Sequence, residues 1–260
     1  MTNNRSRSLV PAQGNFNDID LLKTISGSVL SEKMQSLYIV GAHRLDEKTL
    51  LDIIFPNLKF ICVFEPLEGP RATLLTMAGQ DRRMKILPFA ISDFDGVSEF
   101  KISTNDGESS SLLSFGTHQQ MFPHVGVERT QQVEVRRLAT VIKEYDIPPP
   151  DCMIVDVQGA EYSVLAGLET ENLNLVRLIY TEVSTEPVYE GGRLLADIEF
   201  FLRDRFENVG FASLMPSTPT HGNVIFVNKS DTGRLFRKSL TFRAKQHYWH
   251  LRQVIRKFLA

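Results

Sequence analysis

Acidic side chains recur at the points where short apolar runs of this sequence end. Glu65 follows the run 59–64, Asp156 follows a later run, and Glu182 lies near the end of a third. A carboxylate can accept hydrogen bonds from hydroxyl groups, remove a proton or offset a positive charge. Because the carboxyl ends of parallel strands meet at one edge of a sheet, we expect these side chains to face one crevice.

A glycine turn precedes the first of these acids. The segment 37–46 reads LYIVGAHRLD, so four apolar residues run into Gly41, Ala42 and His43. Gly41 lets the chain turn sharply and lets a ligand approach the backbone closely. The turn therefore predicts either a cofactor contact or an ordinary connection between a strand and a helix.

Glu65 lies 24 residues beyond Gly41, and Pro66 fixes the backbone beside it. An acid about 20 residues after a glycine turn accepts hydrogen bonds from ribose hydroxyls in nucleotide-binding folds. The two features together predict an adenosine-containing cofactor, with a helix-capping or solvated acid as the alternative. Asp93, after another apolar run, would either meet the amine of a bound adenine or begin a turn.

The densest polar cluster is the stretch DVQGAE at 156–161. A glycine turn at a helix start directs Asp156, Gln158 and Glu161 into one crevice, unless Glu161 only adds a favourable charge to the first turn of the helix. Asp156 is the first candidate for the reacting centre, as a general base or as a fixed negative charge. Glu182 offers another carboxylate at the same edge.

A polar loop is predicted at 104–131. Loops of this length in a compact domain are usually functional or disordered. Ser110 and Ser111 are therefore candidates for contacts with a substrate, and the loop histidines His118 and His124 are candidates for an alternative base. The histidines of the chain do not fall into metal-ligand spacing, so we predict no metal site.

Repeated alternation of strands with helices must position these residues. The alternation predicts an α/β fold with a doubly wound, mainly parallel sheet, whose third strand covers 84–91. The segments 97–103 and 132–136 alternate with period two, which predicts an antiparallel insertion. Residues 18–35 have apolar side chains at helical spacing and predict a leading helix.

Charge is divided unevenly along the 260 residues. Residues 231–260 carry eight Lys or Arg against one acid, or +7, so the net charge of −2 leaves −9 for residues 1–230. We therefore predict an arm with a leading helix at 1–35, a main domain at 36–230 and a basic amphipathic C-terminal helix at 231–260. That helix would dock onto its own domain or a second copy of the chain, or contact an anionic membrane. No nucleic-acid partner is predicted.

The remaining composition is that of an ordinary globular chain, 42% hydrophobic and 23% charged. No apolar run reaches the roughly 18–20 residues that span a bilayer, and the N-terminal residues show no secretory signal. Cys62 and Cys152 lie in apolar runs and predict buried free thiols in a reducing compartment. We therefore expect a cytoplasmic location.

These motifs, in this order, resemble the FkbM family of S-adenosylmethionine-dependent methyltransferases. The matching stretches, spread over residues 36–228, are IVGAH, VFEP, AISDFDG, SSSL, VEVRRL and IVDVQGAEYSVLAGL. The resemblance implies a class I methyltransferase, Rossmann-like fold, S-adenosylmethionine as cofactor, and a hydroxyl of a sugar or natural product as acceptor. It implies the methionine end of the donor at Gly41, Ala42 and His43, its ribose at Glu65 and Pro66, its adenine at Asp93, and its sulfonium at Asp156.

Two departures from the family pattern bear on activity. Gln158 stands where the family motif has Glu, and the residues at 43–46, HRLD, stand where the family turn has a further glycine. The second departure leaves open a narrower pocket, a basic residue beside the donor carboxylate, or loss of donor binding. An inactive binding or scaffold protein is therefore one alternative, and an NAD-dependent oxidoreductase is another. The missing later glycines argue against the oxidoreductase, because a pyrophosphate needs close backbone approach.

Overall fold

Seven strands form one sheet in the computed structural model, which describes residues 21–213 and 220–235. The strands are β1 (Ser36–Val40), β2 (Phe60–Phe64), β3 (Met84–Leu87), β7 (Cys152–Val155), β8 (Leu178–Ser184), β9 (Phe206–Ser213) and β10 (His221–Asn228). Their order across the sheet is β3-β2-β1-β7-β8-β10-β9. All pairs are parallel except those of β10, which runs antiparallel to β8 and β9. The order reverses between β1 and β7, where doubly wound folds bind ligands.

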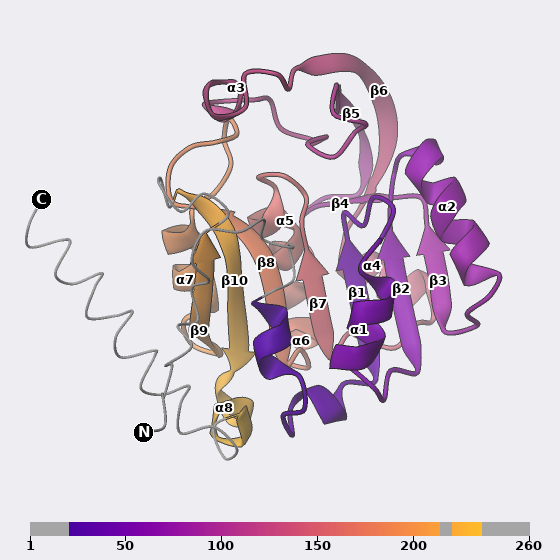
Figure 1. Ribbon diagram of the computed structural model, residues 1–260, viewed down its shortest axis with the longest axis vertical. Coiled ribbons are helices and arrows are strands. Elements are labelled where there is room, and N and C mark those ends of the chain that lie inside the picture. The colour runs from indigo at the N-terminus through magenta and orange to yellow at the C-terminus, as the bar shows by residue number, and fades with distance from the viewer. Residues whose placement is uncertain (1–20, 214–219, 236–260) are drawn as a thin grey trace, which may run out of the picture.

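Helices cover both faces of this sheet (Figure 1). One face carries α1 (Lys48–Ile54), α2 (Glu68–Ala78) and two 3-10 turns, Leu22–Ile25 and Ser31–Lys33. The other carries α4 (Leu138–Tyr145), α5 (Glu161–Ala166), α6 (Glu169–Leu173) and α7 (Leu195–Leu202). The sheet is therefore the middle of three layers.

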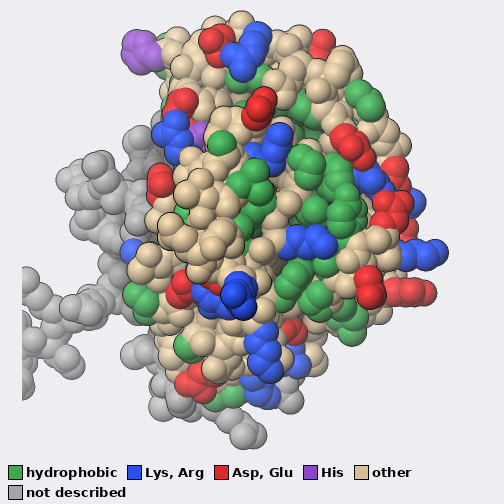
Figure 2. All heavy atoms as spheres, turned by 90° about the vertical axis from the view of Figure 1, so that its right-hand side faces the viewer, with side chains coloured by type: hydrophobic (Ala, Val, Ile, Leu, Met, Phe, Trp, Pro, Cys, Tyr) green, Lys and Arg blue, Asp and Glu red, His purple; other side chains and the backbone are tan. Residues whose placement is uncertain are grey.

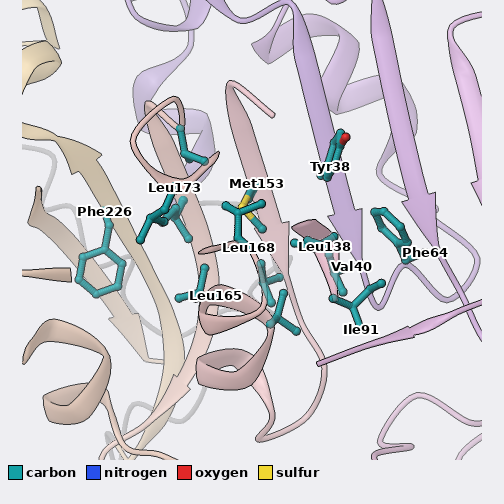
Figure 3. Packing of buried hydrophobic residues seen from close by; sticks show 14 of the residues in the cluster. Tyr38, Val40, Phe64, Ile91, Leu138, Met153, Leu165, Leu168, Leu173 and Phe226 are labelled. Atoms are coloured by element: carbon teal, nitrogen blue, oxygen red, sulfur yellow. The ribbon is translucent and has the colours of Figure 1, made fainter. Parts of the chain in front are cut away.

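Alternate side chains of β1 enter two separate cores. Leu37 and Ile39 pack in the core beneath α1, whereas Tyr38 and Val40 pack in the core beneath α4 and α5. Every residue of β1 is buried, as expected for a parallel strand covered on both faces. Figure 3 shows the core beneath α4 and α5, where Met153 of β7 lies among leucines from the helical layer that covers this face. This packing fixes the ends of β1 and β7 relative to each other.

A smaller sheet lies over the ends of the parallel strands (Figure 1). It consists of β4 (Ala90–Ile91), β5 (Gly96–Ser103) and β6 (Val127–Arg136), in the order β4-β6-β5. The strands β5 and β6 are antiparallel, and the short helix α3 (His118–Met121) lies in the connection between them. The doubly wound, mainly parallel sheet and its antiparallel insertion are therefore confirmed.

Three local predictions were wrong. The predicted strand 84–91 is interrupted at Pro88, which has no N–H for the ladder, so β4 joins the small sheet instead. The predicted leading helix is replaced by the two 3-10 turns, because Gly27 adopts φ +71° between them. The predicted loop 104–131 is shorter, because β6 already begins at Val127.

The ends of the predicted domains differ from the described structure. Residues 21–35 do not form a separate arm, because Leu22, Ile25 and Leu30 are buried in the core beneath α1. The predicted boundary at residue 230 falls inside α8 (Lys229–Leu235). The basic helix predicted for 231–260 lies mostly outside the described residues, and so does its proposed membrane contact.

Two further observations concern the whole described chain. Cys62 and Cys152 are free and buried, as predicted. Across residues 21–213 and 220–235, no helix combines the length and apolar character needed to cross a bilayer.

Figure 2 shows the side of the molecule that faces right in Figure 1, where hydrophobic side chains gather between charged ones. Exposed apolar side chains of the described chain include Leu75 of α2, Val97 of β5 and Val127 of β6. None of these observations tests contact with a second copy of the chain, which stays a prediction.

Candidate functional site

Two cavities lie at the point where strand order reverses. The apolar cavity, with a volume of about 50 Å³, is lined mainly by Phe64, Leu67, Phe89, Ile91, Phe100 and Leu112, together with Glu65 and Pro66. The polar cavity, of about 470 Å³, is lined among others by Ala42, Arg44, Asn105, Ser109, His118, Glu182, His221 and Asn223. Both cavities contact Gly41, His43, Glu108, Asp156 and Gln158, which form their shared wall.

The glycine turn after β1 is fitted against the end of β7. Gly41 adopts φ +80°, and a Cβ there would lie 1.8 Å from the backbone oxygen of Asp156. The N–H of Asp156 in turn donates to the carbonyl of Val40, at 3.0 Å. Only glycine allows this approach, so the turn and Asp156 occupy fixed positions relative to each other.

Glu65 ends β2 and is buried in the wall of the apolar cavity. Its Oε2 accepts the backbone N–H of His43 at 2.9 Å, and its Oε1 accepts that of Leu67 at 2.8 Å. Burial raises the pKa of Glu65 above its ordinary value, and these two hydrogen bonds oppose that rise. Each carboxylate oxygen keeps a second lone pair that can accept a hydrogen bond from a ligand.

The segment after β5, residues 105–112, lines both cavities and is called here the β5 loop. Asp106 of this loop contacts the glycine turn twice. Its carbonyl lies 3.0 Å from His43 Nε2, and its carboxylate forms an ion pair with Arg44. We call these contacts the Asp106 clasp. The apolar cavity is far smaller than the roughly 300 Å³ of a small ligand site, so its walls must move apart before a nucleoside can enter, and the β5 loop forms one of these walls.

Serines of the β5 loop hold its shape. Ser110 Oγ accepts the N–H of Ser103 at 3.0 Å, and Ser110 also borders the apolar cavity. Ser111 is fully buried and donates its hydroxyl to the backbone oxygen of Gln158 at 2.7 Å. Ser111 therefore joins the loop to the turn after β7 and lines neither cavity.

The turn after β7 carries a hydrogen-bonded network. Gln158 Nε2 donates to Asp156 Oδ1 and to Glu182 Oε2, both at 2.7 Å. The other oxygen of Glu182 lies 2.9 Å from His221 Nε2. Tyr189 donates its hydroxyl to Gln158 Oε1. The network joins the ends of β7 and β8 to the start of β10, which lies at the same sheet edge because β10 is antiparallel.

Glu161 is the first residue of α5, and its side chain holds the turn after β7 in place. Its Oε1 accepts the N–H groups of Val157 and Gly159 at 3.1 and 3.0 Å. Burial raises the pKa of Glu161 to about 7, and the nearby Asp156 adds to that rise. Glu161 is buried and lines neither cavity, so the structure gives it a supporting position instead of the predicted contact with a substrate.

His118 of α3 faces the polar cavity. Its ring stacks on Phe115 at 4.2 Å between centroids and also contacts Phe122 and Tyr189. Burial, together with the charge of His221, lowers the pKa of His118 to about 4, so the imidazole is neutral near pH 7. Its Nδ1 has no hydrogen-bond partner among the described residues.

The structure brings most of the predicted site residues together. The predicted residues that line a cavity are Gly41, Ala42, His43, Glu65, Pro66, Ser110, Asp156, Gln158 and Glu182. Asp93 and His124 are exposed and line neither cavity. Asp93 follows β4, which left the parallel sheet at Pro88, and His124 lies beyond α3. At both positions the predicted contact therefore disagrees with the geometry.

Sequence reasoning missed several lining residues. His221 carried no local motif, and only its position at the start of an antiparallel neighbour of β8 brings it beside Glu182. Phe89, Phe100 and Leu112 were unremarkable apolar residues until the small sheet placed them around one cavity.

This arrangement has definite chemical capabilities. The apolar cavity has the lining chemistry for a flat apolar ring attached to a hydroxylated sugar, with Glu65 at its wall, once its walls move apart. The polar cavity offers carboxylates, amides and imidazoles, which suit a ligand rich in hydroxyl groups. One oxygen each from Asp156, Glu161 and Glu182 also lie within 4.8 Å of one another, a spacing that could hold a metal ion.

Comparison with known proteins gives two sequence matches. A model of the methyltransferase FkbM domain matches residues 41–211. Over 142 residues the chain is 34% identical to the 2-O-methyltransferase NoeI of Sinorhizobium fredii (strain NBRC 101917 / NGR234). That match covers 52% of this chain and 58% of NoeI, so the chain spans little more than half of this relative.

Several solved structures are similar in outline. Methyltransferase FkbM from Methylobacillus flagellatus KT has a TM-score of 0.47 at 13% identity, covering 74% of this chain and 43% of that one. Aeropyrum pernix fibrillarin in complex with natively bound S-adenosyl-L-methionine has a TM-score of 0.44 at 13% identity, covering 85% and 87%.

Proposed function

Because the chain belongs to the FkbM methyltransferase family, we propose that it transfers a methyl group from S-adenosylmethionine to a hydroxyl oxygen of a small acceptor. Its seven-stranded, mainly parallel sheet is the class I methyltransferase, Rossmann-like fold expected from the sequence. The relative NoeI, a 2-O-methyltransferase, supports oxygen as the receiving atom. A sugar or a polyhydroxylated natural product is the proposed acceptor class, because the polar cavity is rich in hydrogen-bonding side chains.

The two cavities suit the two reactants. In this proposal the adenine occupies the apolar cavity, and Glu65 accepts hydrogen bonds from the ribose. The methionine end lies along Gly41, Ala42 and His43, where the polar cavity begins. The acceptor occupies the rest of the polar cavity. The donor requires the walls of the apolar cavity, which include the β5 loop, to move apart, since the cavity measures only about 50 Å³.

The position of Asp156 is the main support for the proposal, because this residue lies on the wall shared by both cavities. A negative charge there faces the positively charged sulfonium of the donor and the hydroxyl of the acceptor at once. Holding the two reactants in line supplies much of the rate acceleration of such a transfer. The methyl carbon bonds to the acceptor oxygen while its bond to sulfur breaks, and the electron pair stays on sulfur.

The hydroxyl proton needs a base, and two residues of the polar cavity are candidates. Asp156 is one, as predicted from the sequence. His118 is the other, because its imidazole is neutral near pH 7 and borders the cavity. His124, the other histidine considered from the sequence, is exposed outside the cavity. We assign the proton to Asp156, and His118 is the alternative base, a weak one because burial lowers its pKa to about 4.

Isothermal titration tests the donor, and product analysis tests the reaction. We expect S-adenosylhomocysteine to bind and NAD to show no heat above dilution. Incubation with S-adenosylmethionine and a panel of neutral saccharides should then yield a product heavier by one methylene group, detected by mass spectrometry. Binding of NAD alone would support the oxidoreductase alternative, and absence of any donor binding would support the inactive scaffold.

A further inference from the structure

We propose that Gln158 is a positioning residue whose amide takes the place of a cation between Asp156 and Glu182. Without a donor between them, two carboxylates this close would repel each other and would need a shared proton or a metal ion. Gln158 Nε2 instead donates to one oxygen of each, at 2.7 Å. The amide thereby holds the two carboxylates together at the shared wall without adding a charge.

With Asp156 and Glu182 ionised, the amide of Gln158 has one orientation that satisfies this network. Carboxylates accept and do not donate, so Nε2 must face Asp156 and Glu182. The hydroxyl of Tyr189 donates to Oε1 from the other side. Both N–H groups of the amide are therefore used, and its carbonyl already accepts one hydrogen bond.

The backbone is shaped to hold this amide in place. Gln158 adopts φ +57°, a left-handed conformation that is uncommon for residues other than glycine. The following Gly159 adopts φ +98°, and a Cβ there would lie 2.7 Å from the ring of Tyr189. Glu161 fixes the same turn by accepting two of its N–H groups. Such strain persists only where surrounding contacts enforce it, which they do here.

The charges around Gln158 explain why a neutral donor matters. Asp156, Glu161 and Glu182 each place one oxygen within 4.8 Å of the others, and Glu182 also contacts His221. A fourth carboxylate at position 158 would lie against two of these oxygens. It would then need a divalent cation to offset the charge. The amide supplies the hydrogen bonds without adding charge, so the wall keeps its attraction for a sulfonium in the proposed methyl transfer.

Thermal melting with and without divalent cations tests this role and requires neither donor nor acceptor. The wild-type melting temperature should differ by less than about 1 °C between EDTA and 5 mM Mg²⁺ or Mn²⁺. In EDTA, Gln158→Glu should melt about 5 °C lower or more, because it places like charges together in a buried site. Adding Mn²⁺ should restore about 3 °C or more, since binding to the folded state alone stabilises it.

A matched double variant identifies the ligands of the added cation. Asp156→Asn combined with Gln158→Glu removes one carboxylate from the cluster, and the recovery with Mn²⁺ should disappear. Gln158→Met, which is neutral and cannot donate, should also melt lower than wild type. If both single variants fail to fold in EDTA, the wild-type response to Mn²⁺ still decides the question.

Two results would overturn the proposal. Stabilisation of the wild type by several degrees with Mg²⁺ or Mn²⁺ would mean that the carboxylates themselves hold a metal. A Gln158→Glu variant that melts like wild type in EDTA, with no response to cations, would mean that the amide does not hold the carboxylates together. The inference rests on the proposed function only for the purpose of the charge. Failure of donor binding would therefore refute the proposed function, and the conclusions from these melting temperatures would still hold.

Discussion

Replacing Glu65 with Gln tests the proposed ribose site, and the structure changes the result to be expected. From the sequence, this change should weaken donor binding with little effect on the melting temperature of the free protein. In the structure, however, both carboxylate oxygens already accept backbone N–H groups, from His43 and Leu67. The glutamine has only one carbonyl oxygen, so its NH₂ group must face one of these N–H groups. One hydrogen bond is lost and two donors oppose each other.

The loss of stability can be estimated from these contacts. A hydrogen bond to a charged group is worth about 1.5–3 kcal/mol. Because burial raises the pKa of Glu65, the charged form is disfavoured there, and removing the charge recovers part of the loss. We therefore take the lower end, about 1.5 kcal/mol, which corresponds to a melting temperature about 3–6 °C lower for a domain of this size.

The loss of donor affinity follows from the same oxygens. The ribose hydroxyls would donate to the second lone pairs of the carboxylate, and Gln removes at least one such bond together with its charge. A loss of about 1.5–3 kcal/mol corresponds to a roughly ten- to hundredfold rise in the Kd of S-adenosylhomocysteine.

Titration calorimetry measures this affinity, and differential scanning fluorimetry measures the melting temperature. Glu68→Gln provides a matched control for affinity, since Glu68 is exposed and lines neither cavity, and it should leave the Kd unchanged. A Glu65→Gln variant that binds S-adenosylhomocysteine like wild type would reject the ribose assignment. An unchanged melting temperature would reject the two backbone hydrogen bonds.

Three further substitutions test the roles assigned to Asp156, His118 and Glu161. Asp156→Asn should lower single-turnover methyl transfer by about 10²-fold or more while changing donor affinity much less, and a wild-type rate would remove Asp156 from the reacting centre. The lowered pKa of His118, about 4 against an ordinary 6.5, favours folding above pH 6.5, and this contribution is lost as pH falls towards 4. His118→Phe should therefore melt with less acid sensitivity than wild type, and retained methyl transfer would exclude His118 as the alternative base. The raised pKa of Glu161, about 7 against 4.5, favours folding below pH 4.5, and this contribution is lost as pH rises through 7. The melting temperature of Glu161→Gln should therefore rise relative to that of wild type as the pH increases from 5 to 8. A constant difference between the two melting temperatures would contradict the assigned pKa.

The parallel sheet was predictable because its strands and helices have strong local signals. Apolar runs such as those of β1 and β2 are buried on both faces, and this leaves a continuous pattern in the sequence. Gly41 and Glu65 could be assigned to one crevice for the same reason, since the ends of parallel strands share an edge.

The rest of the site depends on long-range pairing that local patterns do not record. Asp93 was placed by counting strands, and one proline moved β4 into another sheet. His221 lies beside Glu182 only because β10 pairs antiparallel with β8, with residue 221 opposite residue 184. The choice between His118 and His124 depended on how the connection between β5 and β6 folds over the strand ends, which composition alone cannot specify.

The β5 loop implies an order in which the reactants bind. The donor can enter only after the walls of the apolar cavity, which include this loop, move apart, whereas an acceptor in the polar cavity would contact the loop through Asn105 and Ser109 and hold it in place. We therefore expect the donor to enter first and S-adenosylhomocysteine to leave last. In steady-state kinetics, S-adenosylhomocysteine would then compete with the donor and not with the acceptor. The exposed ion pair of the Asp106 clasp must open in each cycle, so added salt, which screens such pairs, should speed exchange of the nucleoside.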